Sequence, residues 1–194
     1  MPVPFIGGFY YSITFKVHYY LVYYAKSMKN CLGFTLLELI ITVGIIGVLT
    51  AIAVPSMGIY VKNERLTSQI NTLVSHLTYA RNQAVTQSQQ TVVCISNNGV
   101  NCSGTDWSDG WIVFADSDGN ATVNDLETVL LAQQSLAGNT LTSTIGTSVI
   151  YDNRGFAKTA VGTFSLCDDR LLANLKSIQV SITGRVRQGG ATSC

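Results

Sequence analysis

The sequence lacks the short motifs that mark the common classes of enzyme. It has no G-x-S-x-G nucleophile elbow, no glycine-rich phosphate-binding loop and no H-E-x-x-H zinc motif. Its 194 residues include only two histidines, His18 and His76, and neither lies near a candidate nucleophile in the sequence. We therefore assign no catalytic residue and expect neither an enzyme nor a bound cofactor.

Charge is absent from one long stretch of the chain. No Asp, Glu, Lys or Arg occurs from Leu39 to Val61, and the part up to Val54 is almost wholly apolar. The apolar part, extended at either end, approaches the roughly 20 residues that span a bilayer as a helix. A buried core helix is the alternative interpretation, and the residues that precede the stretch argue against it.

The remaining charge is unevenly distributed. Between Asn82 and Asn153 there are seven carboxylates and no Lys or Arg, whereas no acidic residue occurs from Arg170 onward. That last segment carries four basic residues, which are Arg170, Lys176, Arg185 and Arg187. Removal of residues 1–33 would leave nine basic and eleven acidic residues, a net charge of −2. A basic tail on a mildly acidic chain predicts a localised anionic partner.

Paired cysteines of the C-x₂-C type are also missing, although five cysteines are present. Cys31 lies in the part that we expect to be removed, which leaves four. An even number in a domain delivered across a membrane favours two disulfides over a zinc site. Among three possible connectivities we predict Cys94–Cys102, which closes a local turn, and Cys167–Cys194, which ties the C-terminus to a strand.

Residues 1–27 hold nine of the sixteen Phe and Tyr residues, with no clear helical or alternating period. They form either an extra membrane-associated segment or an upstream extension from a misplaced start codon. We favour the extension, with Met28 as the true start. Residues 28–33 are then a complete short leader with its positive charge on the cytoplasmic side.

From Phe34 to about Ser88 the pattern predicts one long helix, with Pro55 expected to kink it. Its second half is amphipathic, with apolar residues at three- and four-residue steps: Leu66, Ile70, Leu73, Val74, Leu77, Ala80 and Ala84. After Gln90 the period changes to two. The predicted strands are Thr91–Ser96, Trp111–Ala115, Thr128–Gln133, Ser148–Tyr151, Thr163–Cys167 and Ser177–Val186. Short connections favour antiparallel pairing, so the expected fold class is α+β, one long helix packed on antiparallel sheet.

The start of the long helix carries a recognisable motif. Gly33-Phe34-Thr35-Leu36-Leu37-Glu38, followed by the apolar span, closely resembles the processing site of type IV pilins and type II secretion pseudopilins. The resemblance implies that prepilin peptidase cleaves between Gly33 and Phe34 and methylates Phe34. It also implies a leader over residues 1–33, a transmembrane assembly helix over 34–61 and a pilin head domain over 62–194.

The same resemblance implies a location and partners. The precursor would be a single-pass protein of the bacterial inner membrane with a periplasm-facing head, and other pilin subunits would carry it into an extracellular pilus. A carboxylate at the bilayer centre costs roughly 2.5–3.5 kcal/mol and usually has a partner. The free amine of a neighbouring subunit can neutralise Glu38 during assembly. A capping carboxylate at a helix N-terminus is the alternative, and the surrounding motif favours assembly.

The head resembles the FimT/FimU/GspH group of minor pilins and pseudopilins, in the stretches Leu77–Ala84, Gly110–Phe114 and Tyr151–Gly155. Gly184-Arg185-Val186-Arg187 is similar to the GRxR motif of FimT-type pilins, which is associated with DNA binding in natural transformation. On a strand, Arg185 and Arg187 would project from one face and bind phosphates, and Gly184 would let a backbone approach closely. Lys176 and Arg170 would add to the positive field. Two arginines on a solvated edge are the alternative.

One acidic loop imitates the ligand series of a calcium-binding EF-hand. The residues at the matching positions are Asp116, Asp118, Asn120, Thr122, Asn124 and Glu127. Ala121 stands where that loop requires glycine, and no helical pair flanks it, so we favour a hairpin turn and assign no metal ligand.

Two functions remain from these observations. The first is a FimT-like minor pilin that binds DNA through its basic tail. The second is a purely structural minor pilin, or a minor pseudopilin of a type II secretion system, for which the GRxR segment has no evident use.

Overall fold

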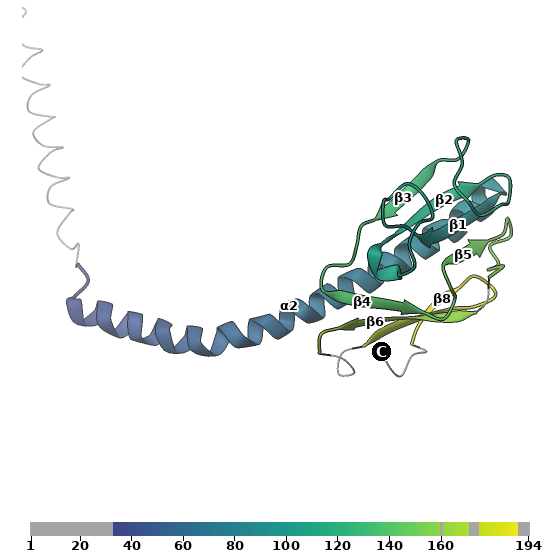
Figure 1. The fold of residues 1–194 in the computed structure, drawn as a ribbon. Coiled ribbons are helices and arrows are strands. Elements are labelled where there is room, and N and C mark those ends of the chain that lie inside the picture. The colour runs from purple at the N-terminus through teal and green to yellow at the C-terminus, as the bar shows by residue number, and fades with distance from the viewer. Residues whose placement is uncertain (1–32, 160, 171–174, 190–194) are drawn as a thin grey trace, which may run out of the picture. The chain divides into compact units, whose positions relative to one another are not determined.

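The computed structural model describes residues 33–159, 161–170 and 175–189. The chain divides into two compact units, residues 1–53 and 54–194. The first unit contains the start of helix α2 (Leu36–Gln87), and the second contains the rest of α2 and the strands (Figure 1). The predicted extension 1–27 and the leader up to Leu32 lie outside the described residues.

Helix α2 has a capped N-terminus. The hydroxyl oxygen of Thr35 accepts a hydrogen bond from the Glu38 backbone N–H at 3.2 Å, and its carbonyl accepts one from the Leu39 N–H at 3.1 Å. Thr followed three residues later by Glu is the sequence pattern of such a cap. The carboxylate of Glu38 therefore lies in the first helical turn.

The part of α2 in the first unit exposes its large apolar side chains all round, among them Leu39, Ile46 and Ile52. Within the described residues α2 is the one helix long and apolar enough to cross a membrane, judged by length and composition. The span predicted from Leu39 to Val61 lies inside it. The helix is continuous through Pro55, and the predicted kink there stays a prediction.

The backbone conformation at Ser88 explains why α2 ends there. Ser88 adopts a positive φ of 52°, and Gln89 N–H donates to the Ala84 carbonyl at 3.2 Å while Ser88 N–H donates to Val85 O at 3.4 Å. This pair of bonds is the Schellman arrangement, which satisfies carbonyls that the helix leaves free. The helix ends within one residue of the predicted boundary.

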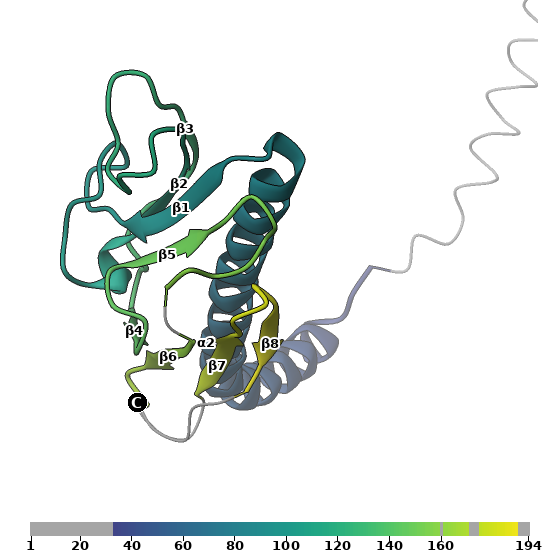
Figure 2. The ribbon, with the colours of Figure 1, turned by 90° about the vertical axis from the view of Figure 1, so that its right-hand side faces the viewer.

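In the second unit α2 packs on two four-stranded antiparallel sheets (Figures 1 and 2). Six of the seven residues of its predicted apolar stripe are buried, and Val74 packs against them. The first sheet has the order β3-β2-β1-β5, with β1 Gln90–Ile95, β2 Trp111–Asp116, β3 Val129–Gln133 and β5 Ser148–Tyr151. The second has the order β4-β6-β7-β8, with β4 Asn139–Ser143, β6 Gly162–Asp168, β7 Lys176–Val180 and β8 Val186–Gln188. The α+β prediction is confirmed, with two sheets.

One strand prediction was wrong, and one strand was missed. The run Ser177–Val186 is not one strand, because residues 181–185 form a turn that folds β8 back onto β7. Strand β4 was not predicted, since its sequence, Asn-Thr-Leu-Thr-Ser, has a single apolar residue, Leu141. Pairing along β6 holds it in the sheet.

Two tryptophans of the main core have hydrogen-bond partners for their indole N–H groups. Trp107, in the short helix η1 (Trp107–Asp109), packs edge-on against Phe164 and donates its indole N–H to Gly146 O at 2.7 Å. Trp111 donates its indole N–H to His76 Nδ1 at 3.1 Å. Burial lowers the pKa of His76, which keeps this nitrogen free to accept.

Candidate functional site

The predicted processing site precedes the helix. Gly33 and Phe34 are exposed and lie outside regular secondary structure, so their peptide bond is not held in a helical ladder. Glu38 is also exposed. Cleavage after Gly33, methylation of Phe34 and the assembly role of Glu38 stay predictions.

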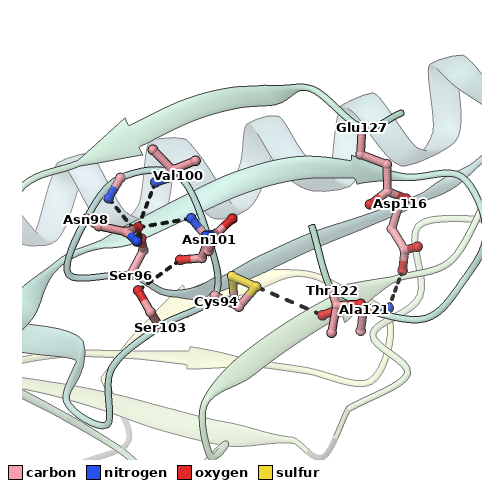
Figure 3. Close-up of a disulfide and its surroundings, with 12 residues drawn as sticks. Cys94, Ser96, Asn98, Val100, Asn101, Ser103, Asp116, Ala121, Thr122 and Glu127 are labelled. Carbon is pink, nitrogen blue, oxygen red and sulfur yellow. Dashed lines mark hydrogen bonds between the residues drawn. A yellow bond between two sulfur atoms is a disulfide. The ribbon is translucent and has the colours of Figure 1, made fainter. Parts of the chain in front are cut away.

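The turn after β1 contains the predicted Cys94–Cys102 disulfide, with Cα atoms 5.5 Å apart, and that pairing is confirmed (Figure 3). The Asn98 side-chain oxygen accepts hydrogen bonds from the Val100 and Asn101 N–H groups, which shapes the turn. The Cys102 sulfur lies 3.9 Å from Ala121 O in the neighbouring loop, and as a disulfide sulfur it carries no proton to donate. Cys167 is buried in β6, whereas Cys194, its predicted partner, lies outside the described residues, so that bridge stays a prediction.

The acidic loop connects β2 to β3 as a hairpin. Asp116 is buried and accepts hydrogen bonds from Gln90 Nε2 at 2.5 Å, Gly119 N–H at 2.7 Å and Ala121 N–H at 3.0 Å. Carboxylate oxygens of Asp116, Asp118 and Glu127 lie within 4.8 Å of one another. These three hydrogen bonds satisfy the buried carboxylate of Asp116, and the two from backbone N–H groups hold the turn closed.

The GRxR segment lies at the turn between β7 and β8. Ser181 N–H donates to the Arg185 carbonyl at 3.0 Å, and Gly184 N–H donates to the Ser181 carbonyl at 2.8 Å. The Ser181 hydroxyl oxygen also accepts a hydrogen bond from the Arg185 N–H at 3.2 Å. These bonds fix the backbone from which Arg185 projects.

The cross-strand pairs decide which way the arginines face. Val180 pairs with Val186, and both pack toward the core, so the neighbouring pair Gln179–Arg187 faces the opposite side. Continuing the alternation of β8 by one residue would place Arg185 on that side as well, because it is two residues from Arg187. Both arginines are exposed, and neither is paired with a carboxylate of the described residues. The predicted common face of Arg185 and Arg187 agrees with this pairing and stays a prediction, because Arg185 precedes the first residue of β8.

Gly184 has a structural role that the sequence did not reveal. It is buried at φ +74°, and a Cβ at this position would lie 2.0 Å from the Gly155 carbonyl oxygen. The same oxygen accepts a hydrogen bond from Arg81 Nε at 3.0 Å. The backbone that approaches Gly184 is therefore the protein's own. Arg81, Gly155 and Gly184 come from three separate stretches of family resemblance, and only the fold shows that they meet.

Two other predicted phosphate ligands lie elsewhere. Arg170 donates from Nε to the Asp168 carboxylate at 2.6 Å and from a terminal nitrogen to the Asn63 side chain at 2.8 Å. This hydrogen bonding by Arg170 holds the pKa of Asp168 below its ordinary value. Lys176 is exposed, but strand alternation places it on the face of Ile178, opposite to Arg187. The structure brings Arg185 and Arg187 together and does not add Arg170 or Lys176 to them.

Two protein-family models match the sequence. The model of the family described as type II transport protein GspH matches residues 69–184, and the prokaryotic N-terminal methylation motif matches residues 28–54. The chain therefore belongs to the GspH family. It carries the N-terminal motif of type IV pilin-like proteins, and its class is that of a minor pilin or minor pseudopilin.

Solved structures of the minor pilin FimU share the fold at low sequence identity. A crystal structure of the type IV minor pilin FimU of Pseudomonas aeruginosa is 17% identical, with a TM-score of 0.56 over 70% of this chain and 98% of its own. The minor pseudopilin EpsH of the Vibrio cholerae type 2 secretion system is 12% identical, with a TM-score of 0.47 over 65% of this chain and 97% of its own. No curated protein matches the sequence.

Proposed function

We propose that this protein is a FimT-like minor pilin of a type IV pilus that binds DNA for uptake through Arg185 and Arg187. Prepilin peptidase cleaves it after Gly33, and the mature helix anchors it in the inner membrane until other pilins take it into the filament. The observation that supports the DNA-binding part is the pair of exposed arginines, two residues apart on the β7–β8 hairpin, without a carboxylate partner among the described residues.

The chemistry of the pair suits phosphate. Guanidinium groups stay charged and bind phosphate oxygens bidentately, and two on the same face can contact neighbouring phosphates. Contacts of this kind do not depend on base sequence. Two contacts alone give affinity on the order of micromolar or weaker, so several copies on one filament would raise it through avidity.

The test is the salt dependence of duplex DNA binding by the whole chain in a nonionic detergent. Each phosphate contact contributes about 0.9 to the slope of log affinity against log salt, so the parent should show a slope near −2. Arg185→Gln and Arg187→Gln should each remove about one unit, and the double variant most of the binding. Arg65→Gln, the same charge change at an exposed position on α2, is the matched control and should leave the slope unchanged.

A double variant that binds duplex DNA like its parent at equal salt would remove the receptor role. The structural minor pilin or the secretion pseudopilin would then be the remaining function. Membership of the GspH family is compatible with either outcome.

A further inference from the structure

The contact between Gly155 and Gly184 brings a second group of exposed side chains to the GRxR turn. Arg154 and Phe156 flank Gly155 in the chain, and Arg185 follows Gly184, so all three begin one residue from the contact. A hydrogen bond from Ala157 N–H to the Ile182 carbonyl at 3.0 Å ties the β5–β6 connection to the β7–β8 turn (Figure 2). We call Arg154, Phe156, Ile182 and Arg185 the Phe156 patch.

Arg154 and Phe156 are held in a defined arrangement. The Asp152 carboxylate accepts hydrogen bonds from Arg154 Nε at 3.2 Å and from a terminal nitrogen at 3.0 Å, and also from the backbone N–H groups of Arg154 and Phe156, each at 2.9 Å. The guanidinium carbon of Arg154 lies 5.4 Å from the centre of the Phe156 ring. This is the distance of a cation–π contact, in which the guanidinium lies over the Phe156 ring, and we call the two stacked groups the platform.

The platform is open to solvent. The Arg154 side chain is 76% exposed, Phe156 is 44% exposed and Ile182 is 63% exposed. Burial raises the pKa of Asp152, but the hydrogen bonds from Phe156 and Arg154 outweigh it and keep the carboxylate ionised. Much of the charge of Arg154 is thus balanced in place, and Arg185 supplies the unpaired positive charge of the patch.

A phosphate backbone alone does not explain this composition. The phosphates of a duplex bind cationic side chains, and they make no favourable contact with a Phe ring or an Ile side chain. Unpaired bases stack on aromatic rings and on planar guanidinium groups, while nearby arginines hold their phosphates. We propose that the Phe156 patch binds the bases of single-stranded DNA, with Arg185 and Arg187 on the adjoining phosphates. This inference rests on the proposed DNA-binding function and names its preferred ligand.

The experiment separates bases from phosphates. The whole chain in nonionic detergent is titrated by fluorescence anisotropy into an oligothymidylate strand, an abasic sugar-phosphate strand of equal length and a duplex, at one salt concentration. Phe156→Ala should weaken binding of the oligothymidylate about ten-fold, the effect of losing one stacked base, and leave the other two ligands unchanged. Phe156→Leu should behave like Phe156→Ala, because it keeps apolar volume and loses the aromatic face.

The control is Leu126→Ala, which removes another exposed apolar side chain, 91% exposed in the β2–β3 loop, and should change none of the three affinities. The inference is overturned if Phe156→Ala weakens the abasic strand as much as the oligothymidylate, or if Phe156→Leu binds like the parent. The second outcome would show that apolar volume, and not an aromatic face, is what the strand contacts at this position. Failure of the proposed function looks different, because the Arg185→Gln/Arg187→Gln variant would then bind all three ligands like the parent.

Discussion

At the scale of single residues, Gly184 shows how a binding motif can depend on packing. Its positive φ suits glycine, and its missing Cβ leaves room for the Gly155 carbonyl, which Arg81 holds by a hydrogen bond. The glycine of the GRxR segment therefore positions the turn, and the two arginines that follow it are free for a ligand. A glycine with a purely ligand-facing role would not be buried.

We predict that Gly184→Ala destabilises the head far more than Gly119→Ala. Gly119 has a similar φ of +78° and open space around it, so alanine there costs only the backbone term, roughly 1–2 kcal/mol. At Gly184 the new methyl would also collide with the Gly155 oxygen, so the loss of unfolding free energy should be at least about twice as large as at Gly119. Urea unfolding followed by tryptophan fluorescence measures both, because Trp107 and Trp111 are buried. Equal losses would show that the close approach does not matter.

At the scale of elements, sequence periodicity correctly predicted which face of the long helix is buried. The stripe of α2 from Leu66 to Ala84 was predictable because each of its residues has to bury an apolar side chain. The hairpin at Ser181–Arg185 was missed because Ser, Ile and Thr before Gly184 suit a strand as well as a turn. The pairing of Arg170 with Asp168 was not predictable either, since charge in a sequence does not tell which side chains pair with carboxylates.

The pairing of Arg170 leads to a prediction at this scale. Arg170 links the end of β6 to α2 through Asp168 and Asn63, so Arg170→Gln should destabilise the head by about 1–3 kcal/mol at neutral pH, because the buried Asp168 carboxylate loses a charged partner. The slope of DNA binding against salt should not change. Urea unfolding and the salt titration measure the two effects, and a lowered slope with unchanged stability would assign Arg170 to the ligand instead.

The same pair predicts a pH dependence. Because Arg170 lowers the folded-state pKa of Asp168, this carboxylate stabilises the fold above its ordinary pKa, and that contribution is lost as pH falls through the folded-state value. The stability difference between the parent and Arg170→Gln should therefore shrink on acidification. A difference that stays constant from neutral to strongly acidic pH would contradict the link.

At the scale of the whole molecule, the chain combines a head with its own core and a helix whose start has no core to join. The apolar side chains from Leu36 to Ala53 are exposed, and nothing among the described residues of the first unit covers them. A bilayer and then the helices of other pilins can both do so. The N-terminal methylation motif matches residues 28–54, a range that includes the predicted cut and the start of this helix.

Processing and assembly can be tested separately with Glu38. The intact mass of the protein from membranes should be that of a chain that begins at Phe34 and carries one added methyl group.

Glu38→Gln keeps the size of the side chain and should still be cleaved and methylated, since the residues at the cut are unchanged. It should be missing from sheared filaments, because the charge that a neighbouring amine would neutralise is gone. Glu64→Gln, an exposed carboxylate further along α2, is the matched control and should assemble normally. A mature chain that retains residues 1–33 would refute the processing prediction. Glu38→Gln at parental levels in filaments would show that Glu38 serves the helix start, where the Thr35 cap already places it, and not the pairing of subunits.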